Sequence, residues 1–197
     1  KIKRGKIQAP YTQDEFYLNI PESWIKVNLD DITQIVTDGT HQTPCYVNHG
    51  RPFLPAQNVK PFRFMPEECR YVTEEDFLLY TKNIKAEKGD LLVGRVGSKG
   101  ETAVIDTDLE FAFYVSLGLV KTMKELTNPE YLAIVMNSPY GFRYASGNMS
   151  SLGASAGNFN LGHIRAFPIP LPSFAEQQAI VDRVNTIMDM IDDLEKQ

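Results

Sequence analysis

The sequence predicts an α+β fold in which a mixed, twisted β-sheet carries peripheral helices and is followed by a long C-terminal helix of the coiled-coil type. Strand-like runs of Leu, Val and Phe surround a glycine turn at residues 89–106 and continue at 111–121, which predicts a sheet core. Helical patterns occur at 71–88 and 128–147. In residues 173–197 apolar side chains recur at intervals of 4-3-4-3, the pattern of a coiled-coil seam.

The chain divides into three parts. We expect residues 1–19 to form a polar N-terminal arm, residues 20–170 one domain and residues 173–197 the terminal helix. A chain of 197 residues is long enough for one domain with a proper core plus an appendage. The segment 20–32 predicts a strand that enters a short helical turn, and 52–55 predicts a short strand between two loops.

Residues 71–88 predict a strand that continues into a surface-packed helix. Thr73 can cap this helix because a threonine hydroxyl accepts a hydrogen bond from a free amide of the first turn. We expect Phe77, Leu78 and Ile84 to supply its apolar face.

Residues 128–147 predict a helix that begins at an Asn128 cap, has Pro129 in its first turn and is interrupted at Pro139. The small and polar stretch 148–164 follows. Its composition predicts a long loop, either mobile or ordered by a ligand, that ends in a short turn.

The terminal helix has a distinct start. Ser173 and Glu176 form a Ser-x-x-Glu pattern, which predicts a capping box. The apolar seam that follows consists of Ile180, Val184, Ile187, Ile191 and Leu194. Such a seam favours contact with a partner helix or a partner subunit, although a helix that folds back on its own domain is the alternative.

Composition and termini indicate an ordinary soluble, cytoplasmic protein. Hydrophobic residues make up 43% and charged residues 23% of the chain. No apolar run approaches the roughly 20 residues that span a bilayer, and no apolar segment follows the basic start as in a signal peptide. Because Lys1 is not an initiator methionine, we expect a piece of a longer protein.

The net charge of −5 hides a segregation that bears on nucleic-acid binding. The segment 173–197 holds six acids and two bases, so the rest of the chain, with 18 bases and 19 acids, is nearly neutral. No Asp or Glu occurs from Gly39 to Pro66 or from Tyr131 to Ala175. A surface that faces phosphates must exclude carboxylates, so these windows are candidates for it, unless they are partly buried loops.

Two motifs that suggest chemistry have simpler interpretations. "NSPYG" (137–141) approaches the Asp/Asn-Pro-Pro-Tyr motif with which DNA amino-methyltransferases hold a flipped base, but no glycine-rich turn for adenosylmethionine accompanies it. A helix broken by Pro139 is the favoured reading. "GRVGSKG" (94–100) matches no phosphate-binding spacing and precedes a strand, which predicts a β-hairpin turn.

No metal or nucleophilic site is predicted. His41, His49 and His163 lie too far apart in the sequence for a helical pair of ligands. Cys45 and Cys69 are too widely spaced for a CxxC pair, and we expect them to be small buried side chains.

The remaining features give a preference for nucleic acid. Asn and Gln amides can read adenine, whereas Arg and Lys can reach guanine or phosphate. Chosen by expected exposure and chemistry, the candidate DNA contacts are Thr40, His41, Gln42, Gln57, Asn58, Lys60, Arg63, Arg95, Ser98, Lys99, Arg143 and Tyr144.

In their order along the chain, several segments resemble the specificity subunits of type I restriction-modification enzymes. The resemblance covers nearly the whole chain. It is carried by "IPESWIKVNLDDI", "DGTHQTPCYVNHGRPFLPAQNV", "CRYVTEEDF", "KGDLLVGRVGSKGETAVI" and "NFNLGHIRAFPIPLPSFAEQQAIVDRVNTIMDMIDDLE".

The resemblance implies a target recognition domain followed by a conserved coiled-coil helix, which is half of a usual subunit. Such a domain is expected to recognise one half of a split double-stranded DNA site, while modification subunits bind S-adenosylmethionine and methylate adenine. A restriction subunit would join indirectly, and the helix could associate with another copy. No catalysis and no cofactor are expected in this chain. The alternatives are an interaction module without DNA affinity and a stand-alone amino-methyltransferase.

The terminal helix would also act as a ruler between half-sites. Its 25 residues, at about 1.5 Å each, span roughly 37 Å, or about 11 base pairs. Its negative charge fits a helix that does not approach phosphate.

Overall fold

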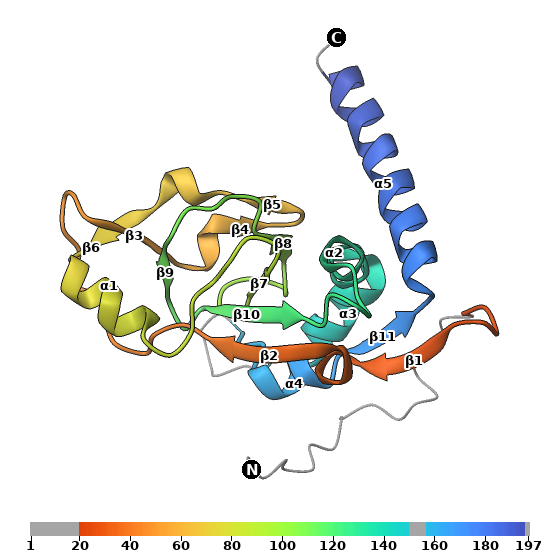
Figure 1. The fold of residues 1–197 in the computed structure, drawn as a ribbon, viewed down its shortest axis with the longest axis horizontal. Helices are drawn as coiled ribbons and strands as arrows, with labels where there is room; N and C mark the ends of the chain where they lie inside the picture. The colour runs from red at the N-terminus through yellow and green to blue at the C-terminus, as the bar shows by residue number, and fades with distance from the viewer. Residues whose placement is uncertain (1–19, 150–156, 196–197) are drawn as a thin grey trace.

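The computed structural model describes residues 20–149 and 157–195 (Figure 1). They form an α+β body from which one long helix projects. Within this part of the chain, no helix has the length and apolar character needed to cross a membrane.

A four-stranded antiparallel sheet forms the centre of the body, in the order β2 (Thr33–Asp38), β10 (Leu117–Thr122), β7 (Leu91–Gly94), β8 (Thr102–Val104). Successive side chains of β7 point into two different cores, as the alternation of a strand requires. Leu91 and Val93 pack with the helices, whereas Leu92 packs with Leu54 and Phe113. Both faces are covered, which is why β7 is apolar throughout.

A second, three-stranded sheet has the order β6 (Arg70–Val72), β3 (Arg51–Leu54), β9 (Ala112–Phe113), and its β3–β9 pair is parallel. The single strand predicted at 111–121 is therefore wrong, because the chain changes sheets between β9 and β10. Tyr114 and Val115 lie between β9 and β10. Their backbone N–H groups donate to the carbonyl oxygens of Leu54 and Thr40, each at 3.0 Å.

The helix α1 (Glu74–Thr81) covers the second sheet. Its Thr73 cap is confirmed, since the Thr73 hydroxyl accepts from the amide of Asp76 at 3.1 Å. Phe77 is buried as predicted, but Leu78 is 58% exposed and Ile84 lies beyond the helix end. A helix that touches the sheet edge along a narrow line has no room for a second apolar row.

The helices α2 (Pro129–Asn137), α3 (Pro139–Gly147) and α4 (Leu161–Arg165) contribute to the core on one side of the central sheet. Asn128 caps α2 through a 2.8 Å bond from the Glu130 amide, and the interruption before Pro139 is confirmed. Of the loop predicted at 148–164, residues 150–156 lie outside the described residues, while α4 is the short turn expected at its end.

The strands β1 (Ile25–Asn28) and β11 (Pro168–Leu171) pair antiparallel at the base of the projecting helix, and a 3₁₀ turn at Leu29–Ile32 follows β1, as predicted (Figure 1). Pro168 and Pro170 have no N–H group, so the mutual hydrogen bonds of this pair fall at Ile169 and Leu171.

The two proline carbonyls are bonded to helices of the core. The Tyr140 hydroxyl donates to the Pro168 carbonyl at 2.6 Å, and the Tyr131 hydroxyl donates to that of Pro170. These bonds attach the β1–β11 pair to α2 and α3.

The projecting helix is α5 (Phe174–Glu195). Half of the predicted capping box forms, because the Ser173 hydroxyl accepts from the Glu176 amide at 3.3 Å while the Glu176 carboxylate binds the indole of Trp24 at 3.0 Å. Val181 is buried, and of the predicted seam Ile180 and Val184 are half-buried. The remaining seam residues, Ile187, Ile191 and Leu194, are 43%, 43% and 69% exposed. Only the first turns of α5 therefore pack against the domain, and the rest of the described helix does not fold back on it.

Candidate nucleic-acid interface

The loop before β4 and the loop after β7 meet at one hollow of about 270 Å³. Three of the predicted contacts, Gln57, Lys60 and Ser98, line it together with Val96 and Glu101. Gln57, Lys60 and Val96 are exposed, so amide, ammonium and methyl groups are available at one place. These are the groups with which proteins contact base edges and phosphates.

Asn58 is not an exposed contact, contrary to the prediction. It is fully buried, and its Nδ2 donates to the Met65 carbonyl at 2.8 Å while its own carbonyl accepts from the Met65 amide at 2.9 Å. Asn58 therefore closes the base of the hairpin formed by β4 (Val59–Lys60) and β5 (Arg63–Phe64). An amide buried in this way cannot reach a base.

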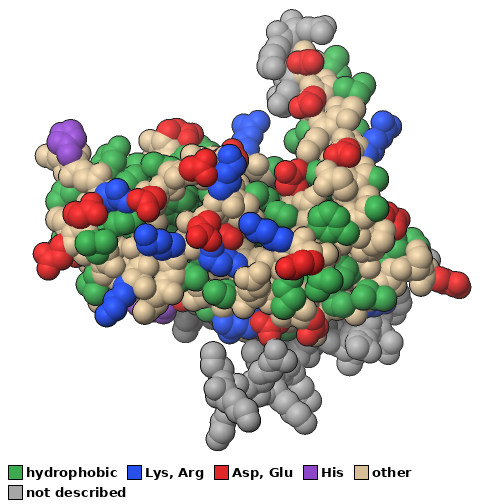
Figure 2. All heavy atoms as spheres, viewed as in Figure 1, with side chains coloured by type: hydrophobic (Ala, Val, Ile, Leu, Met, Phe, Trp, Pro, Cys, Tyr) green, Lys and Arg blue, Asp and Glu red, His purple; other side chains and the backbone are tan. Residues whose placement is uncertain are grey.

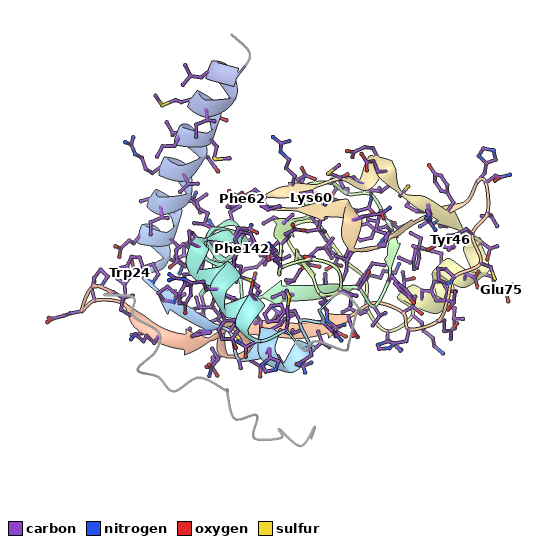
Figure 3. All side chains as sticks on the ribbon, turned by 180° about the vertical axis from the view of Figure 1, so that it is seen from behind. Trp24, Tyr46, Lys60, Phe62, Glu75 and Phe142 are labelled. Atoms are coloured by element: carbon purple, nitrogen blue, oxygen red, sulfur yellow. The ribbon has the colours of Figure 1, made fainter. Side chains whose placement is uncertain are left out.

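The tip of that hairpin presents an aromatic ring between two cations. Lys60 and Arg63 are exposed on either side of a Pro61-Phe62 turn, and Phe62 is 46% exposed. Figure 3 shows Lys60 and Phe62 on this hairpin. Phe62 has φ 64°, which is costly for a residue with a Cβ, and its amide donates to the Thr102 carbonyl at 3.0 Å. Sequence analysis missed Phe62. Pro61 was a usable signal, because proline favours a turn in which the next residue has a positive φ.

Phe62 and Arg63 also face a second, larger hollow of about 510 Å³ between the hairpin and α5. Ile134 of α2 and Val184 and Met188 of α5 line its opposite side. The hairpin tip therefore lies between the domain surface and the projecting helix.

The loop after β7 is the predicted hairpin turn that presents Ser98 and Lys99. The Ser98 hydroxyl accepts from the Glu101 amide at 3.3 Å and lies over Gly94, where a Cβ would approach it to 2.2 Å. Gly94 is thus needed for the loop to fold back over β7. Lys99 remains exposed.

Arg95, predicted as a contact, is instead buried at 6% exposure. Its Nη1 pairs with the Asp38 carboxylate and donates to the Val115 carbonyl at 2.8 Å, and its Nε donates to the Phe159 carbonyl at 3.2 Å. These partners are far apart in the sequence. Arg95 therefore joins distant segments beneath the loops from a buried position.

The loop after β2 lies over the same floor. Thr40 is held by backbone bonds to Phe113 and Val115, both at 3.0 Å, and is only half-buried. His41 Nε2 lies 3.3 Å from the Asp38 carboxylate that pairs with Arg95, and His41 and Gln42 are exposed. This loop does not line the hollow with Gln57 and Lys60.

On α3 the two predicted contacts separate. Arg143 is exposed but lines neither hollow. Tyr144 is buried, contrary to the prediction, with its ring centroid 4.6 Å from that of Phe167 and its hydroxyl donating to the His163 carbonyl at 3.1 Å. Burial raises the pKa of Tyr144 to about 12. Successive residues of a helix point in different directions, so Arg143 lies at the surface whereas Tyr144 lies in the core.

The charges that line the hollow balance, with one cation, Lys60, against one carboxylate. Glu101 is the one carboxylate among the described residues that line it. On the face seen in Figure 2, acids and bases are interspersed. The acid-free window 131–175 reflects burial in large part, because α2 and α3 supply much of the core, whereas the window 39–66 includes the exposed hairpin tip.

The methyltransferase-like motif has a structural role, as predicted. Pro139 begins α3, and Asn137 is buried at 7% exposure.

In the described ranges 20–149 and 157–195, no three His, Cys, Asp or Glu side chains are grouped to hold a metal ion. The prediction of buried cysteines is wrong for Cys45, which is exposed, and Cys69 is half-buried.

The chain is similar to known proteins in sequence and in fold. The type I restriction enzyme EcoBI specificity subunit of Escherichia coli is 25% identical over 192 residues, which cover 93% of this chain and 39% of that subunit. A chain from a study of the complex assembly and conformational transition of the type I R-M system superposes with TM-score 0.65 at 16% identity, over 93% of this chain and 44% of that one. The HsdS subunit from Thermoanaerobacter tengcongensis gives 0.60 at 14% identity, over 92% and 46%.

These structural likenesses establish the fold, and the chain spans less than half the length of each of these proteins. The family model described as the type I restriction modification DNA specificity domain matches residues 21–197. The chain therefore belongs to the family of type I restriction-modification DNA specificity domains.

Proposed function

We propose that residues 20–170 recognise one half of a bipartite double-stranded DNA site and that residues 173–197 join this domain to the rest of a type I restriction-modification complex. The observation that carries the proposal is the hollow where Gln57, Lys60 and Ser98 meet. The buried residues Asn58 and Arg95 support the loops that carry these side chains. Rigid support of exposed polar groups is what sequence reading requires.

The roles within this surface follow from side-chain chemistry. Gln57 is suited to a bidentate contact with adenine, and a good contact of that kind discriminates against the wrong base by roughly 1–3 kcal/mol. Lys60, Arg63 and Lys99 are suited to phosphate or guanine. Phe62 joins them at the hairpin tip, while Thr40, His41, Gln42, Ser98 and Arg143 remain further candidate contacts.

The chemistry of methylation belongs, in this proposal, to partner modification subunits that bind S-adenosylmethionine and methylate adenine. A restriction subunit with translocase activity joins indirectly. Ile187, Ile191 and Leu194 offer an exposed apolar row to a modification subunit or to a second helix, including one from another copy. The complex would act in the prokaryotic cytoplasm, at the nucleoid when bound to DNA.

The test measures DNA binding by the chain assembled with its modification subunits, over a range of salt concentrations. Lys60→Ala and Lys99→Ala should each lower the salt slope of log affinity by about 0.9, because each removes one phosphate contact. Lys82→Ala, on the exposed end of α1, is the matched control and should leave the slope unchanged.

Sequencing of methylated adenines in cells then tests base recognition. Gln57→Ala should relax one half of the methylated motif and leave the other half intact. If the assembled complex has no sequence preference and the lysine variants bind like the parent, the domain is an interaction module without DNA affinity. The exposed apolar row of α5 is the observation that favours that second function.

A further inference from the structure

The first turn of α5 carries three consecutive polar side chains that each bind another part of the chain. We call Glu176, Gln177 and Gln178 the Glu-Gln-Gln clamp. Its partners lie 49 to 152 residues away in the sequence, before β1 and in the segment that joins β10 to α2. A helix start needs none of these bonds.

Gln177 is the centre of the clamp and is fully buried. Its Oε1 accepts from the backbone amide of Asn128 at 2.9 Å, and its Nε2 donates to the carbonyl oxygens of Leu126 at 3.0 Å and Pro172 at 3.1 Å. Both amide hydrogens are used. One side chain therefore ties the start of α2 to the start of α5.

Gln178 and Glu176 add two bonds in other directions. Gln178 Oε1 accepts from Asn128 Nδ2 at 3.0 Å, while Gln178 Nε2 is oriented by Asp182, at 2.9 Å, one turn along the helix. The Glu176 carboxylate accepts from the Trp24 indole at 3.0 Å, and Figure 3 shows Trp24 at the base of α5.

These bonds exceed what capping requires. The Ser173 hydroxyl already accepts from the Glu176 amide, and the Ser173 carbonyl accepts from the Gln177 amide at 2.9 Å. The side chains of the clamp therefore serve the relation between α5 and the domain rather than the helix end itself.

Beyond the clamp, the first turns of α5 make the attachments to the domain. Val181 is buried, Ile180 and Val184 are half-buried, and Asn185 Nδ2 donates to the Glu130 carboxylate at 3.2 Å. From Ile187 onward the described side chains of the helix are exposed, and the helix leaves the body (Figure 1). Its direction is thus set at its base.

The leverage is large. A helix of 22 residues is about 33 Å long at 1.5 Å per residue, so a tilt of about 10° moves its tip by roughly 6 Å, close to two base-pair steps of DNA. A small change at Gln177 would therefore move the tip of α5 by a distance comparable with the spacing of DNA base pairs.

We propose that the Glu-Gln-Gln clamp is a positioning device that fixes the angle at which α5 leaves the domain, and thereby the separation at which a second half-site is read. The second clause rests on the proposed function. The first concerns this chain alone and can be tested without DNA.

The angle is measured by pulsed electron spin resonance on the 197-residue chain. Nitroxides are placed through Glu75→Cys on α1 and Asp189→Cys on α5, both at exposed positions, after Cys45→Ser and Cys69→Ser. We expect one narrow distance distribution for this parent.

Gln177→Ala should at least double the width of that distribution or displace its maximum, and Gln178→Ala should have a smaller effect in the same sense. Thr186→Ala is the matched control, because the Thr186 hydroxyl donates to the Asp182 carbonyl of its own helix and not to another element among the described residues. Should Gln177→Ala fail to fold, Gln178→Ala decides. Folded variants with the distribution of the parent would overturn the proposal.

Spacer preference in the assembled complex tests the second clause. Methylation is compared on sites whose spacer is native, one base pair shorter or one base pair longer. We expect the clamp variants to raise the ratio of altered-spacer to native-spacer methylation at least fivefold, with half-site sequence unchanged. A ratio equal to that of the parent and of Thr186→Ala would refute this clause, whereas absence of any sequence-specific methylation in the parent would instead refute the proposed function.

Discussion

Asn137 pairs with Thr102 as one strand pairs with another: its Oδ1 accepts from the Thr102 amide at 3.0 Å, and its Nδ2 donates to the Thr102 carbonyl at 2.7 Å. Both residues are buried. The asparagine of the methyltransferase-like "NSPYG" is thus occupied in joining the end of α2 to the edge of β8. It has no amide group left to hold a base.

Asn137→Ala should lower the free energy of unfolding by roughly 1–3 kcal/mol, because it leaves the buried Thr102 N–H without its partner. The Thr102 C=O loses one of two bonds, since the Phe62 amide also donates to it. Chemical denaturation measures the change. Asn185→Ala is the control, since this exposed residue makes one bond to Glu130 and should change stability by less than about 0.5 kcal/mol. Equal losses for the two variants would contradict the assignment.

Arg95→Ala should destabilise the fold by roughly 3–5 kcal/mol, because the Asp38 carboxylate, whose side chain is 15% exposed, would lose its buried partner. Thermal unfolding measures this loss. Arg63→Ala, at an exposed position, should unfold like the parent. A stable Arg95→Ala protein with impaired DNA binding would restore Arg95 as a direct contact.

Alkaline pH should unfold the domain cooperatively. Burial raises the pKa of Tyr131, of Tyr140 and, to about 12, of Tyr144, from the ordinary 10.0. A raised pKa in the folded state means that stability is complete below about pH 10 and falls as the pH rises toward 12, by up to roughly 1.4 kcal/mol per pH unit for each tyrosine. Tyrosinate absorbance and circular dichroism should change together. Ionisation of every tyrosine before any loss of structure would disprove this.

Phe62→Gly should be more stable than Phe62→Ala by roughly 1 kcal/mol, because only glycine accepts the positive φ at this turn without cost. Denaturant unfolding of the two variants isolates this backbone effect, since both lack the ring. Both should bind DNA more weakly than the parent if the ring contributes to the interface. Undiminished binding by both would remove Phe62 from it.

The double variant Ile187→Asp, Ile191→Asp should abolish association through α5 without unfolding the domain, because both side chains are exposed on the apolar row. Sedimentation of the chain alone and with modification subunits measures this. Thr186→Asp, on the same exposed stretch but outside the row, is the control. Association that survives the double variant would place the interface elsewhere.

Features set by local chemistry were predictable from the sequence. The caps at Thr73, Asn128 and Ser173 each depend on residues two or three positions away, and the structure places all three at helix starts. The β7–β8 hairpin likewise follows from a glycine turn between apolar runs.

The candidate site was less predictable, because burial of polar residues depends on distant partners. Asn58, Arg95 and Tyr144 have the chemistry of surface contacts, yet each is buried and hydrogen-bonded inside the fold. The partners of Arg95 lie 20 to 64 residues away. Nothing in the local sequence distinguishes Arg95 from Arg63, which stays at the surface.

The prolines of strand β11 bear on the tendency of the chain to aggregate. A strand edge with free N–H and C=O groups is a template for aggregation with other chains. Pro168 and Pro170 present no donor there, and tyrosine hydroxyls already occupy their carbonyls. The β11 edge of the β1–β11 pair is thus closed to strands of other chains, and the exposed apolar row of α5 does not have this edge as a second adhesive surface beside it.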